Sequence, residues 1–428
     1  MEAFVVKGDF VFSESREKLH CMKDGYLLVE NGHCGGLFER FDTLPETCKA
    51  LPLRDYSGKL IVPGLTDLHI HAPQYMYRGL WMDMELLDWL NRHTFPEEAR
   101  FRDLSFAETA YRQFAEDMRN GGTTRLCVFG TIHTDATLCL MDLLEAQGLR
   151  AYVGKVNMDR NSPDILRETT EESISETKRW LQKAAAGNYR HVKPILSPRF
   201  IPSCTDRLMK ELGDMIREQG FALQSHLSEN QSEVEWVKEL CPWSKSYGDA
   251  YDRPGCFGGE ENPTIMAHCV WCSDEEIALM KKNHVFVAHS PSSNTNLSSG
   301  IAPVRKYLDE GVQMGLATDV AGGSTRSIFR VMADAVQVSK LYWRLIDQTK
   351  KPLTMPEAFY LGTKGGGAFF GKCGSFEKGY AADILVLDES RIPTALTDLS
   401  LEERLERFVY LGDDRDVLHK YIEGEQLF

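Results

Sequence analysis

The sequence predicts an α/β protein in which a TIM-like (β/α)8 barrel stands beside a small β-sandwich domain. From residue 60 onward, eight short apolar stretches alternate with amphipathic helical stretches. Such alternation is typical of a parallel sheet, and eight strand-helix units are enough to close it into a barrel. Before residue 60 and after residue 374, the pattern changes to short β-like runs separated by turn residues. We therefore expect residues 1–60 and 374–428 to pair as the small domain and residues 61–373 to form the barrel.

The eight apolar stretches are the predicted barrel strands. They are residues 60–71, 123–133, 151–159, 191–200, 221–229, 264–269, 285–291 and 312–319. The first of them, LIVPGLTDLHIH, ends with His69 and His71. Side chains two residues apart point to the same face of a strand, so both imidazoles are expected to face one way. Two nitrogen ligands on one face suggest a metal site, but the spacing alone also fits two hydrogen-bonded histidines at a strand end.

The stretches between the predicted strands have the spacing of amphipathic helices. In residues 107–122, apolar side chains recur at intervals of three and four residues, and a pair of glycines ends the run. Residues 206–220 show the same pattern, with Thr205 as the candidate N-cap. Residues 290–300, SPSSNTNLSSG, are instead predicted to be a loop that follows a barrel strand.

Size and charge limit the classes of function. The 428 residues carry a net charge of −14, and 43% of them are hydrophobic, which is typical of a globular protein with a large core. An acidic chain without a basic stripe is not expected to bind nucleic acid. No stretch reaches the ~18 apolar residues that span a bilayer, and the first residues lack the pattern of a signal peptide. We therefore expect a cytoplasmic protein without a membrane partner.

The eleven cysteines indicate reduced thiols rather than a disulfide framework, because their number is odd and their spacing is irregular. Cys269 and Cys272 have C-x-x-C spacing. A structural zinc site would need a second such pair, and the compact deaminase signature would need H-x-E upstream of P-C-x-x-C. Neither is present, so a thiolate metal site is not expected.

Polar side chains gather at one end of the predicted strands. They are His69, His71, His133, Arg199, His226, Glu229, His268, His289 and Asp319. In (β/α)8 barrels the catalytic groups lie at the carboxyl ends of the strands, so this placement agrees with an active site. His133 and His289 fit a structural role equally well, since a histidine at a strand end can simply bond a neighbouring carbonyl.

The PG-x-x-D-x-H-x-H start, the histidines ending the fifth and sixth strands and the aspartate ending the eighth resemble the amidohydrolase superfamily. Several stretches are similar to its guanine-deaminase branch: HAPQY (71–75), WLNRHTFPEE (89–98), KVNMDRNSP (155–163), ETTEES (168–173), SPRF (197–200), SHLSEN (225–230), MAHC (266–269) and GLATDVAGG (315–323). The resemblance implies hydrolytic deamination of guanine to xanthine and ammonia by a metal-bound hydroxide. It also implies a homodimer.

One Zn²⁺ per chain is the cofactor that the resemblance implies, with His69, His71, His226 and Asp319 as ligands. Three neutral imidazoles and one carboxylate suit this cation and leave an open position for a water molecule. Zinc lowers the pKa of such a water from about 15.7 to about 7 in the best-known case, which makes hydroxide available at neutral pH. Lys193, on the fourth predicted strand, is expected well below the metal, so a second metal bridged by a carboxylated lysine is not expected.

Deamination also requires protons for the ring nitrogen and for the leaving amine. Glu229 is the predicted general acid and base, the role that the resemblance gives it, and the chain must turn after His226 for the two side chains to converge. Asp319 is expected to accept the proton of the water. His268 is expected to orient the hydroxide and to stabilise the developing charge. Glu229, His268 and Asp319 are therefore the predicted catalytic residues.

The resemblance places the substrate contacts in three stretches and at one further residue. They are His71, Ala72, Pro73 and Gln74, then Arg199 and Phe200, then His226 and Glu229, and finally Asp319. Gln74 offers a donor and an acceptor to the edge of the ring, Arg199 can donate to O6 of guanine, and Phe200 can pack on the purine. Adenine would leave Arg199 without an acceptor, at a cost of about 1–3 kcal/mol or more, so guanine is favoured.

Two other interpretations stay open. Different contacts at Gln74 or Arg199 would give a related aminohydrolase that acts on a pterin, on 8-oxoguanine or on a triazine. The chain could instead be a non-catalytic barrel that serves as a scaffold, although no predicted metal ligand is missing. A panel of substrates would separate the enzymes, and a metal-free protein with an intact fold would favour the scaffold.

Overall fold

Parallel strands form the centre of the larger part of the molecule. The structure is a computed structural model that describes residues 3–259 and 262–428. Two four-stranded parallel sheets run in the orders β5-β6-β7-β9 and β11-β12-β13-β14. Their strands are β5 (Leu65–His71), β6 (Thr123–Phe129), β7 (Arg150–Gly154), β9 (Val192–Pro194), β11 (Leu223–Leu227), β12 (Thr264–His268), β13 (Phe286–His289) and β14 (Gln313–Leu316), and a separate parallel pair joins β8 (Val156–Asn157) to β10 (Ser197–Pro198). Each of the eight predicted stretches contains at least one of these strands.

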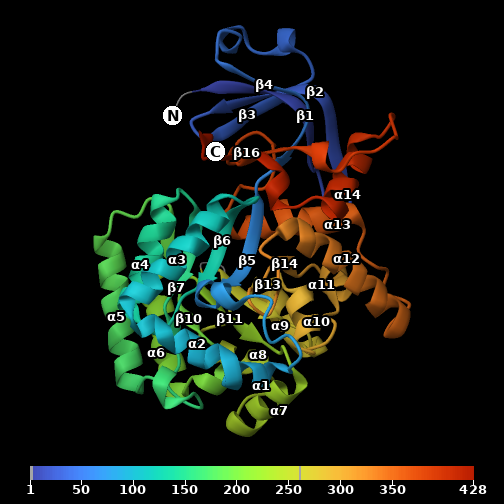
Figure 1. The fold of residues 1–428 in the computed structure, drawn as a ribbon. Coiled ribbons are helices and arrows are strands. Elements are labelled where there is room, and N and C mark those ends of the chain that lie inside the picture. The colour runs from blue at the N-terminus through green and yellow to red at the C-terminus, as the bar shows by residue number, and fades with distance from the viewer. Residues whose placement is uncertain (1–2, 260–261) are drawn as a thin grey trace.

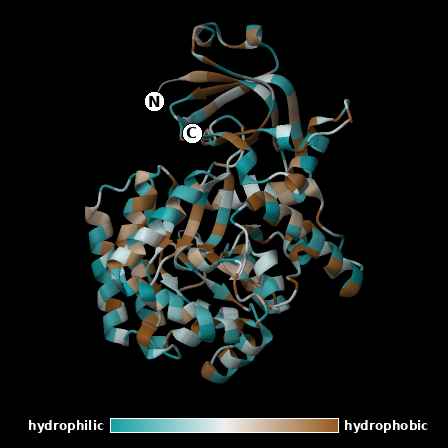
Figure 2. Cartoon of the chain, viewed as in Figure 1, coloured by the Kyte–Doolittle hydropathy of each residue, from teal (hydrophilic) through white to brown (hydrophobic). Residues whose placement is uncertain are grey.

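Each four-stranded sheet is hydrogen-bonded at one edge to a segment that directly follows the last strand of the other sheet. Next to β11, the backbone N–H of Gln224 donates to the carbonyl oxygen of Leu196 (2.9 Å). Beyond β14, the backbone N–H of Asp319 donates to the carbonyl oxygen of His69 (2.9 Å). Apolar residues are frequent along these strands, while hydrophilic residues are frequent on the surrounding helices (Figure 2). The carboxyl ends of β5, β11 and β12 and the segment after β14 therefore share one end of the sheets.

Helices surround these parallel strands (Figure 1). They are α1 (Leu86–Trp89), α2 (Phe95–Ala99), α3 (Leu104–Arg119), α4 (Thr134–Ala146), α5 (Thr170–Ala186), α6 (Asp206–Gln219), α7 (Gln231–Leu240), α8 (Tyr247–Asp252), α9 (Asp274–Lys282), α10 (Pro291–Asn296), α11 (Val304–Glu310), α12 (Ile328–Leu345), α13 (Met355–Tyr360) and α14 (Leu401–Leu411). The helices predicted within 107–122 and 206–220 are confirmed as α3 and α6. Thr205 caps α6 through its hydroxyl, and Gly220 ends it with a φ of 70°. Across the described ranges, no helix combines the length and the apolar character needed to cross a membrane.

Both ends of the chain contribute to a seven-stranded sheet, which lies at the top of Figure 1. Its order is β17 (Glu425–Gln426), β16 (Val417–Ile422), β15 (Ile384–Leu387), β4 (Leu53–Pro63), β1 (Phe4–Ser13), β2 (Leu19–Glu30) and β3 (His33–Phe38). One face of the sheet buries a cluster that includes Phe10, Phe12, Ile61, Phe376 and Ile384. The apolar runs at the two termini are thus confirmed as strands, and they pair although more than 300 residues separate β4 from β15 along the chain.

Two predicted strands are divided in the structure. The stretch 60–71 was expected to be one strand, but Gly64 separates β4, in the terminal sheet, from β5. A Cβ at Gly64 would lie 2.4 Å from the hydroxyl oxygen of Thr124, so only glycine fits this crossing point. The stretch 191–200 was also expected to be continuous, but β9 ends at Pro194, which has no N–H to donate to a neighbouring strand.

Two segments expected to lack helices contain one. Residues 290–300 were predicted to be a loop, but α10 occupies residues 291–296, with Pro291 in its first turn, where a missing N–H costs nothing. The C-terminal segment was expected to hold only short β runs, but it also contains α14, which begins at a capping box between Ser400 and Glu403. Both helices are short, so the sequence offers few turns in which periodicity can be recognised.

Replacing Lys420 with methionine is expected to lower the free energy of unfolding by about 1–3 kcal/mol. Lys420 in β16 is 0% exposed, and its Nζ donates to the carbonyl oxygens of Met118 (3.0 Å), Arg119 (3.2 Å) and Thr123 (2.5 Å). Methionine fills the space but leaves these carbonyls without their donor. Urea denaturation measures the change. Lys378→Met, at an exposed position, is the control and should shift stability by less than about 0.5 kcal/mol; equal effects of the two variants would contradict the prediction.

Candidate active site

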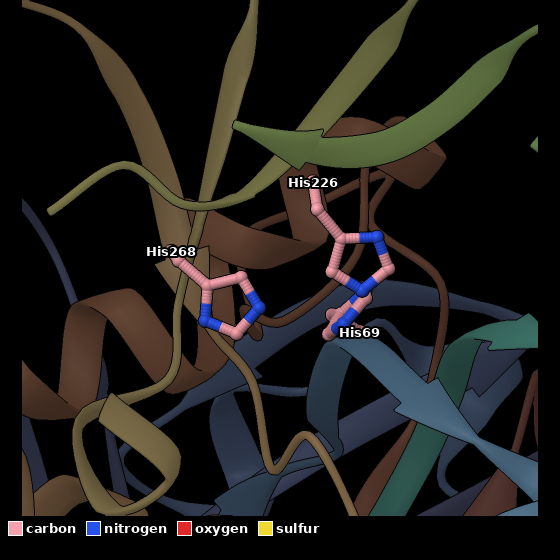
Figure 3. Close-up of side chains that lie close together, drawn as sticks. All are labelled: His69, His226 and His268. Atoms are coloured by element: carbon pink, nitrogen blue, oxygen red, sulfur yellow. The ribbon is translucent and has the colours of Figure 1, made fainter. Parts of the chain in front are cut away.

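Three histidines from two strands meet at the carboxyl end of the parallel sheets. His69 and His71 belong to β5 and His226 belongs to β11, and their exposed fractions are 0%, 3% and 9%. Nε2 of His71 lies 3.2 Å from Nε2 of His69 and 3.2 Å from Nε2 of His226. The rings of His69 and His226 meet in Figure 3, and His268 from β12 lies beside them. The period-two spacing of the first pair thus places both imidazoles on one side of β5.

Asp319 adds a carboxylate to these imidazoles. Its Oδ1 lies 3.1 Å from Nε2 of His69 and 3.5 Å from Nε2 of His71, and its Oδ2 lies 3.7 Å from Nε2 of His268. The φ of Asp319 is 46° and that of His268 is 70°. Both values lie in the left-handed region, which is unfavourable for residues that carry a Cβ and is enriched at functional sites. The backbone conformation therefore aims both side chains at the cluster at some energetic cost.

The donor set fits a divalent cation. With bond lengths of about 2.0–2.2 Å, the ligand atoms of a tetrahedral zinc site lie roughly 3.3–3.6 Å apart, close to the separations measured between these nitrogen and oxygen atoms. Two overlapping groups of side chains could hold an ion: His69, His226 and His268 in one, and His69, His71 and Asp319 in the other. His268, which the sequence suggested only as an orienting group, thus lies within reach of the same ion.

Burial and neighbouring charges place these groups in the protonation states that bind metal. Burial, followed by the charge of His69, lowers the pKa of both His71 and His226 well below the ordinary histidine value. Burial also lowers the pKa of His69, against the opposing charge of Asp319. For Asp319 burial acts upward, but the charge and hydrogen bond of His69 and the charge of His268 lower its pKa overall. Neutral imidazoles beside an ionised carboxylate are the forms that coordinate a cation.

Neighbouring groups hold the second nitrogen of two of the rings. Nδ1 of His226 donates to the carbonyl oxygen of Arg199 (2.6 Å). Nδ1 of His268 donates to Oδ1 of Asn294 (2.8 Å), which α10 supplies. A proton on Nδ1 leaves Nε2 with a free lone pair, directed into the cluster. The sequence did not single out Asn294, because it belongs to the segment expected to be a loop.

Asp67, two residues before His69, ties β5 to the segment after β14. The carboxylate is 0% exposed and accepts three hydrogen bonds: from the N–H of His69 (3.2 Å) and from the N–H (3.0 Å) and the hydroxyl (2.5 Å) of Thr318. Thr318 directly precedes Asp319. Asp67 therefore fixes the distance between the two segments that carry His69 and Asp319.

Glu229 reaches the cluster through the turn that the sequence required after His226. Ser228 has a φ of 48°, so the chain leaves the direction of β11 at that residue. Oε2 of Glu229 lies 3.3 Å from Nε2 of His268, and Oε1 accepts the hydroxyl of Ser299 (3.2 Å). Burial, followed by the charge of Asp319, raises the pKa of Glu229 well above the ordinary value. The carboxyl group therefore keeps its proton to higher pH than an exposed glutamate.

A cavity opens onto these groups. Glu229, His268 and Asp319 all line it, and so do Gln74, Arg199 and Phe200. Its apolar wall consists of Leu86, Trp89, Leu90 and Leu297, for which the sequence predicted no role. Ala72 and Pro73, expected to touch the substrate, are buried in the turn that follows β5 and do not line the cavity.

Gln74 and Arg199 are joined by a residue that the sequence analysis missed. Glu98 in α2 accepts hydrogen bonds from Nε2 of Gln74 and from both terminal nitrogens of Arg199. Glu98 and Trp89 both belong to WLNRHTFPEE, a stretch that was recognised by its resemblance but received no function.

Other residues singled out in the sequence lie outside the cluster. His133 directly precedes α4, makes no capping hydrogen bond with its side chain and lines a different cavity. His289 is 1% exposed at the end of β13, where burial lowers its pKa to about 3. Lys193 is an exposed residue of β9. Cys269 and Cys272 belong to neither group of candidate metal ligands found among the described residues.

Comparisons with known proteins agree with one another. A family model described as "Amidohydrolase family" matches residues 60–427. The chain is 42% identical to the guanine deaminase of Dictyostelium discoideum over 87% of this chain and 83% of that protein. It is 40% identical to the guanine deaminase of Mus musculus over 99% of this chain and 96% of that protein.

A solved structure is similar over the whole length. It is a crystal structure of guanine deaminase from C. acetobutylicum with bound guanine in the active site. The TM-score is 0.95, the sequences are 44% identical, and the alignment covers 100% of both chains. The similarity therefore includes the terminal sheet as well as the parallel sheets and the cavity.

Proposed function

Because this chain belongs to the amidohydrolase family, we propose that it catalyses the hydrolytic deamination of guanine to xanthine and ammonia. The observation that carries the proposal is a single cavity whose wall combines three kinds of group: the buried Glu229, the polar groups of Gln74 and Arg199, and members of the histidine-aspartate cluster, which consists of His69, His71, His226, His268 and Asp319. The histidine-aspartate cluster suits hydrolysis. Gln74 and Arg199 suit the edge of a ring that has both donors and acceptors. The similarity to guanine deaminases over most of the chain supports the same substrate.

The proposed architecture is a (β/α)8 barrel beside a small β domain. Hydrogen bonds from β11 to the segment after β9, and from the segment after β14 to β5, support a closed barrel. The seven-stranded sheet built from both termini supports a small domain of residues 1–60 and 374–428, which β4 extends to Pro63. In such barrels the active site lies at the carboxyl ends of the strands, and the histidine-aspartate cluster occupies that end.

The proposed cofactor is one Zn²⁺ per chain, held by His69, His71, His226 and Asp319. The mixture of neutral nitrogen and ionised oxygen donors supports zinc over a cation that prefers oxygen alone. When bound, the ion supplies a hydroxide nucleophile at neutral pH, because it lowers the pKa of water to about 7 in the best-known zinc enzyme. Around it, the chain keeps the imidazoles neutral by burial, directs the ring of His226 through its Nδ1 and holds the backbone of His69 through Asp67.

Glu229 is the proposed general acid and base. A carboxyl group with a raised pKa keeps its proton to higher pH than an exposed glutamate does, so it can protonate the ring nitrogen. It can then take up the proton that the water gives to Asp319 and pass it to the leaving amine, and the remaining water proton restores the carboxyl group as the new carbonyl forms. Asp319 is proposed to accept a proton from the attacking water. His268 is proposed to orient that water, because its Nε2 lies 3.3 Å from Glu229 and 3.7 Å from Asp319.

Recognition of the purine is assigned to the part of the cavity wall that contains no proposed metal ligand. Gln74 and Arg199 offer polar groups for the ring edge, and Phe200 and Trp89 offer apolar area for the ring faces. Arg199 retains N–H groups beyond the two that Glu98 accepts, so it can still donate to O6 of guanine. Of the other predicted substrate contacts, His71 and His226 line the same cavity, whereas Ala72 and Pro73 are proposed only to shape the turn behind it.

Ammonia release from free guanine by the purified, zinc-supplemented protein tests the function. We expect rapid turnover with xanthine as the product, and a kcat/KM for adenine lower by at least ~10-fold, because adenine leaves Arg199 without an acceptor. A pterin and a triazine are run in parallel. Turnover of one of these rings in place of guanine would overturn the recognition assigned to Gln74 and Arg199 and leave the hydrolytic chemistry intact.

Two further expectations from the sequence analysis stay predictions. A homodimer is tested by light scattering of the purified chain at micromolar concentration. A cytoplasmic location is tested by fractionation of the source cells.

A further inference from the structure

Glu98 connects the two polar recognition side chains although it does not line the cavity. It lies in α2 and is 2% exposed. One carboxylate oxygen, Oε1, accepts from Nε2 of Gln74 (2.8 Å) and from Nη2 of Arg199 (3.0 Å). The other, Oε2, accepts from Nη1 of Arg199 (2.5 Å). Three donors from two different segments thus converge on a single carboxylate.

The contact with Glu98 determines which way the Gln74 amide points. Oε1 of Gln74 accepts the backbone N–H of Ala321 (3.0 Å), while Nε2 donates to Glu98. A flipped amide would direct Nε2 at the N–H of Ala321 and Oε1 at a carboxylate, and both contacts would be repulsive. Gln74 is therefore held in one orientation, with its second N–H and its second lone pair in the same places before any ligand binds.

Glu98 also determines the position and the effective charge of Arg199. The two-pronged contact fixes the plane of the guanidinium, which lies 5.0 Å from the ring centre of Phe95. Arg199 is 3% exposed, so its positive charge needs a partner within the protein. The carboxylate of Glu98 supplies that partner and makes the pair neutral overall, which suits a cavity that must accept a neutral ring.

We propose that Glu98 is a positioning residue for substrate recognition, which acts on the ring edge only through Gln74 and Arg199. The inference rests on the proposed deamination of guanine. It extends the recognition site to a residue from α2 that touches neither the substrate cavity nor the histidine-aspartate cluster. Because Glu98 has no contact with the reacting atoms, its removal should weaken binding of the ring far more than it slows the chemical step.

Glu98→Gln tests the proposal. One carboxylate oxygen becomes an NH₂ group, so at least one of the three hydrogen bonds turns into a contact between donors, and the pair is no longer neutral. We expect KM for guanine to rise at least ~10-fold while kcat stays within about threefold of the wild-type value, the pattern of lost uniform binding. The inhibition constant of xanthine should rise with KM, because the product presents the same carbonyl.

Two further variants separate positioning from a structural effect. Glu98→Asp keeps the charge and is expected to lie closer to the wild type in KM than Glu98→Gln does. Glu357→Gln is the matched control, because Glu357 is also 2% exposed and accepts two hydrogen bonds from one arginine, Arg305, while neither residue lines the cavity. It is expected to keep both KM and kcat, although its melting temperature falls.

The kinetic constants of these variants decide whether Glu98 positions the recognition residues. A raised KM in Glu98→Gln with a nearly normal kcat and with partial recovery in Glu98→Asp supports the positioning role. An unchanged KM, an equal loss in Glu357→Gln, or a loss of kcat alone would overturn it while the wild-type enzyme still deaminates guanine. A wild-type protein that binds zinc but does not turn over guanine would overturn the proposed function and, with it, this inference.

Discussion

Replacing Glu229 with glutamine is expected to lower kcat for guanine at least ~100-fold, the low end of what a general acid and base contributes. The amide keeps the size of the side chain and can still accept the hydroxyl of Ser299, which lies 3.2 Å from Oε1. It has no acidic proton to give to the ring nitrogen or to the leaving amine. Glu229 belongs to neither group of candidate metal ligands, so the metal content should not change. Steady-state kinetics combined with metal analysis measures both quantities.

Controls for this variant separate chemistry from folding. Glu357→Gln makes the same chemical change at a buried carboxylate remote from the cavity, and it should keep kcat. The melting temperature of Glu229→Gln should not fall, because burial already disfavours the ionised form that the amide replaces. A Glu229→Gln enzyme that turns over guanine at a nearly normal rate would remove Glu229 from the mechanism and shift the proton transfers to Asp319 or to water.

Local patterns in the sequence located the barrel strands, although not the breaks in two of them, and also located two helices and most of the polar cluster. Period-two spacing is a property of the extended chain itself, so it placed His69 and His71 on one face, and their Nε2 atoms do lie 3.2 Å apart. The need for a turn between His226 and Glu229 followed from the same geometry, and the left-handed φ of Ser228 provides it. Such deductions hold because they depend on a few adjacent residues.

Contacts between distant segments were beyond the reach of these patterns. Asn294 follows His268 by 26 residues, and Glu98 precedes Arg199 by 101 residues, so no periodicity links either pair. The division of the apolar stretch 60–71 depends on the terminal sheet, because the N–H of Gly64 donates to the carbonyl oxygen of Asp383 (3.0 Å). A continuous run of apolar residues contains no signal for a contact made more than 300 residues later.

Removing the metal is expected to abolish guanine turnover, and adding Zn²⁺ back is expected to restore it. The cluster concentrates three imidazoles and a carboxylate in a buried volume, where they have few partners besides one another. A cation bound only by the folded state also stabilises it, by about 4 kcal/mol when the free ion is a thousandfold above its dissociation constant. The metal-depleted protein should therefore also melt at a lower temperature. Dialysis against a chelator, followed by metal analysis, calorimetry and the guanine assay, measures all three effects.

A pair of histidine variants shows whether this metal occupies the proposed site. His226→Ala removes one of the three converging Nε2 atoms and should lose most of the bound zinc together with the activity. His289→Ala is the matched control: His289 is also buried, at the carboxyl end of β13 in the same sheet, but it belongs to neither group of candidate ligands. It should keep its zinc. If His289→Ala lost zinc as completely as His226→Ala does, zinc retention would depend on packing at the strand ends rather than on these ligands, and the ligand set would be wrong.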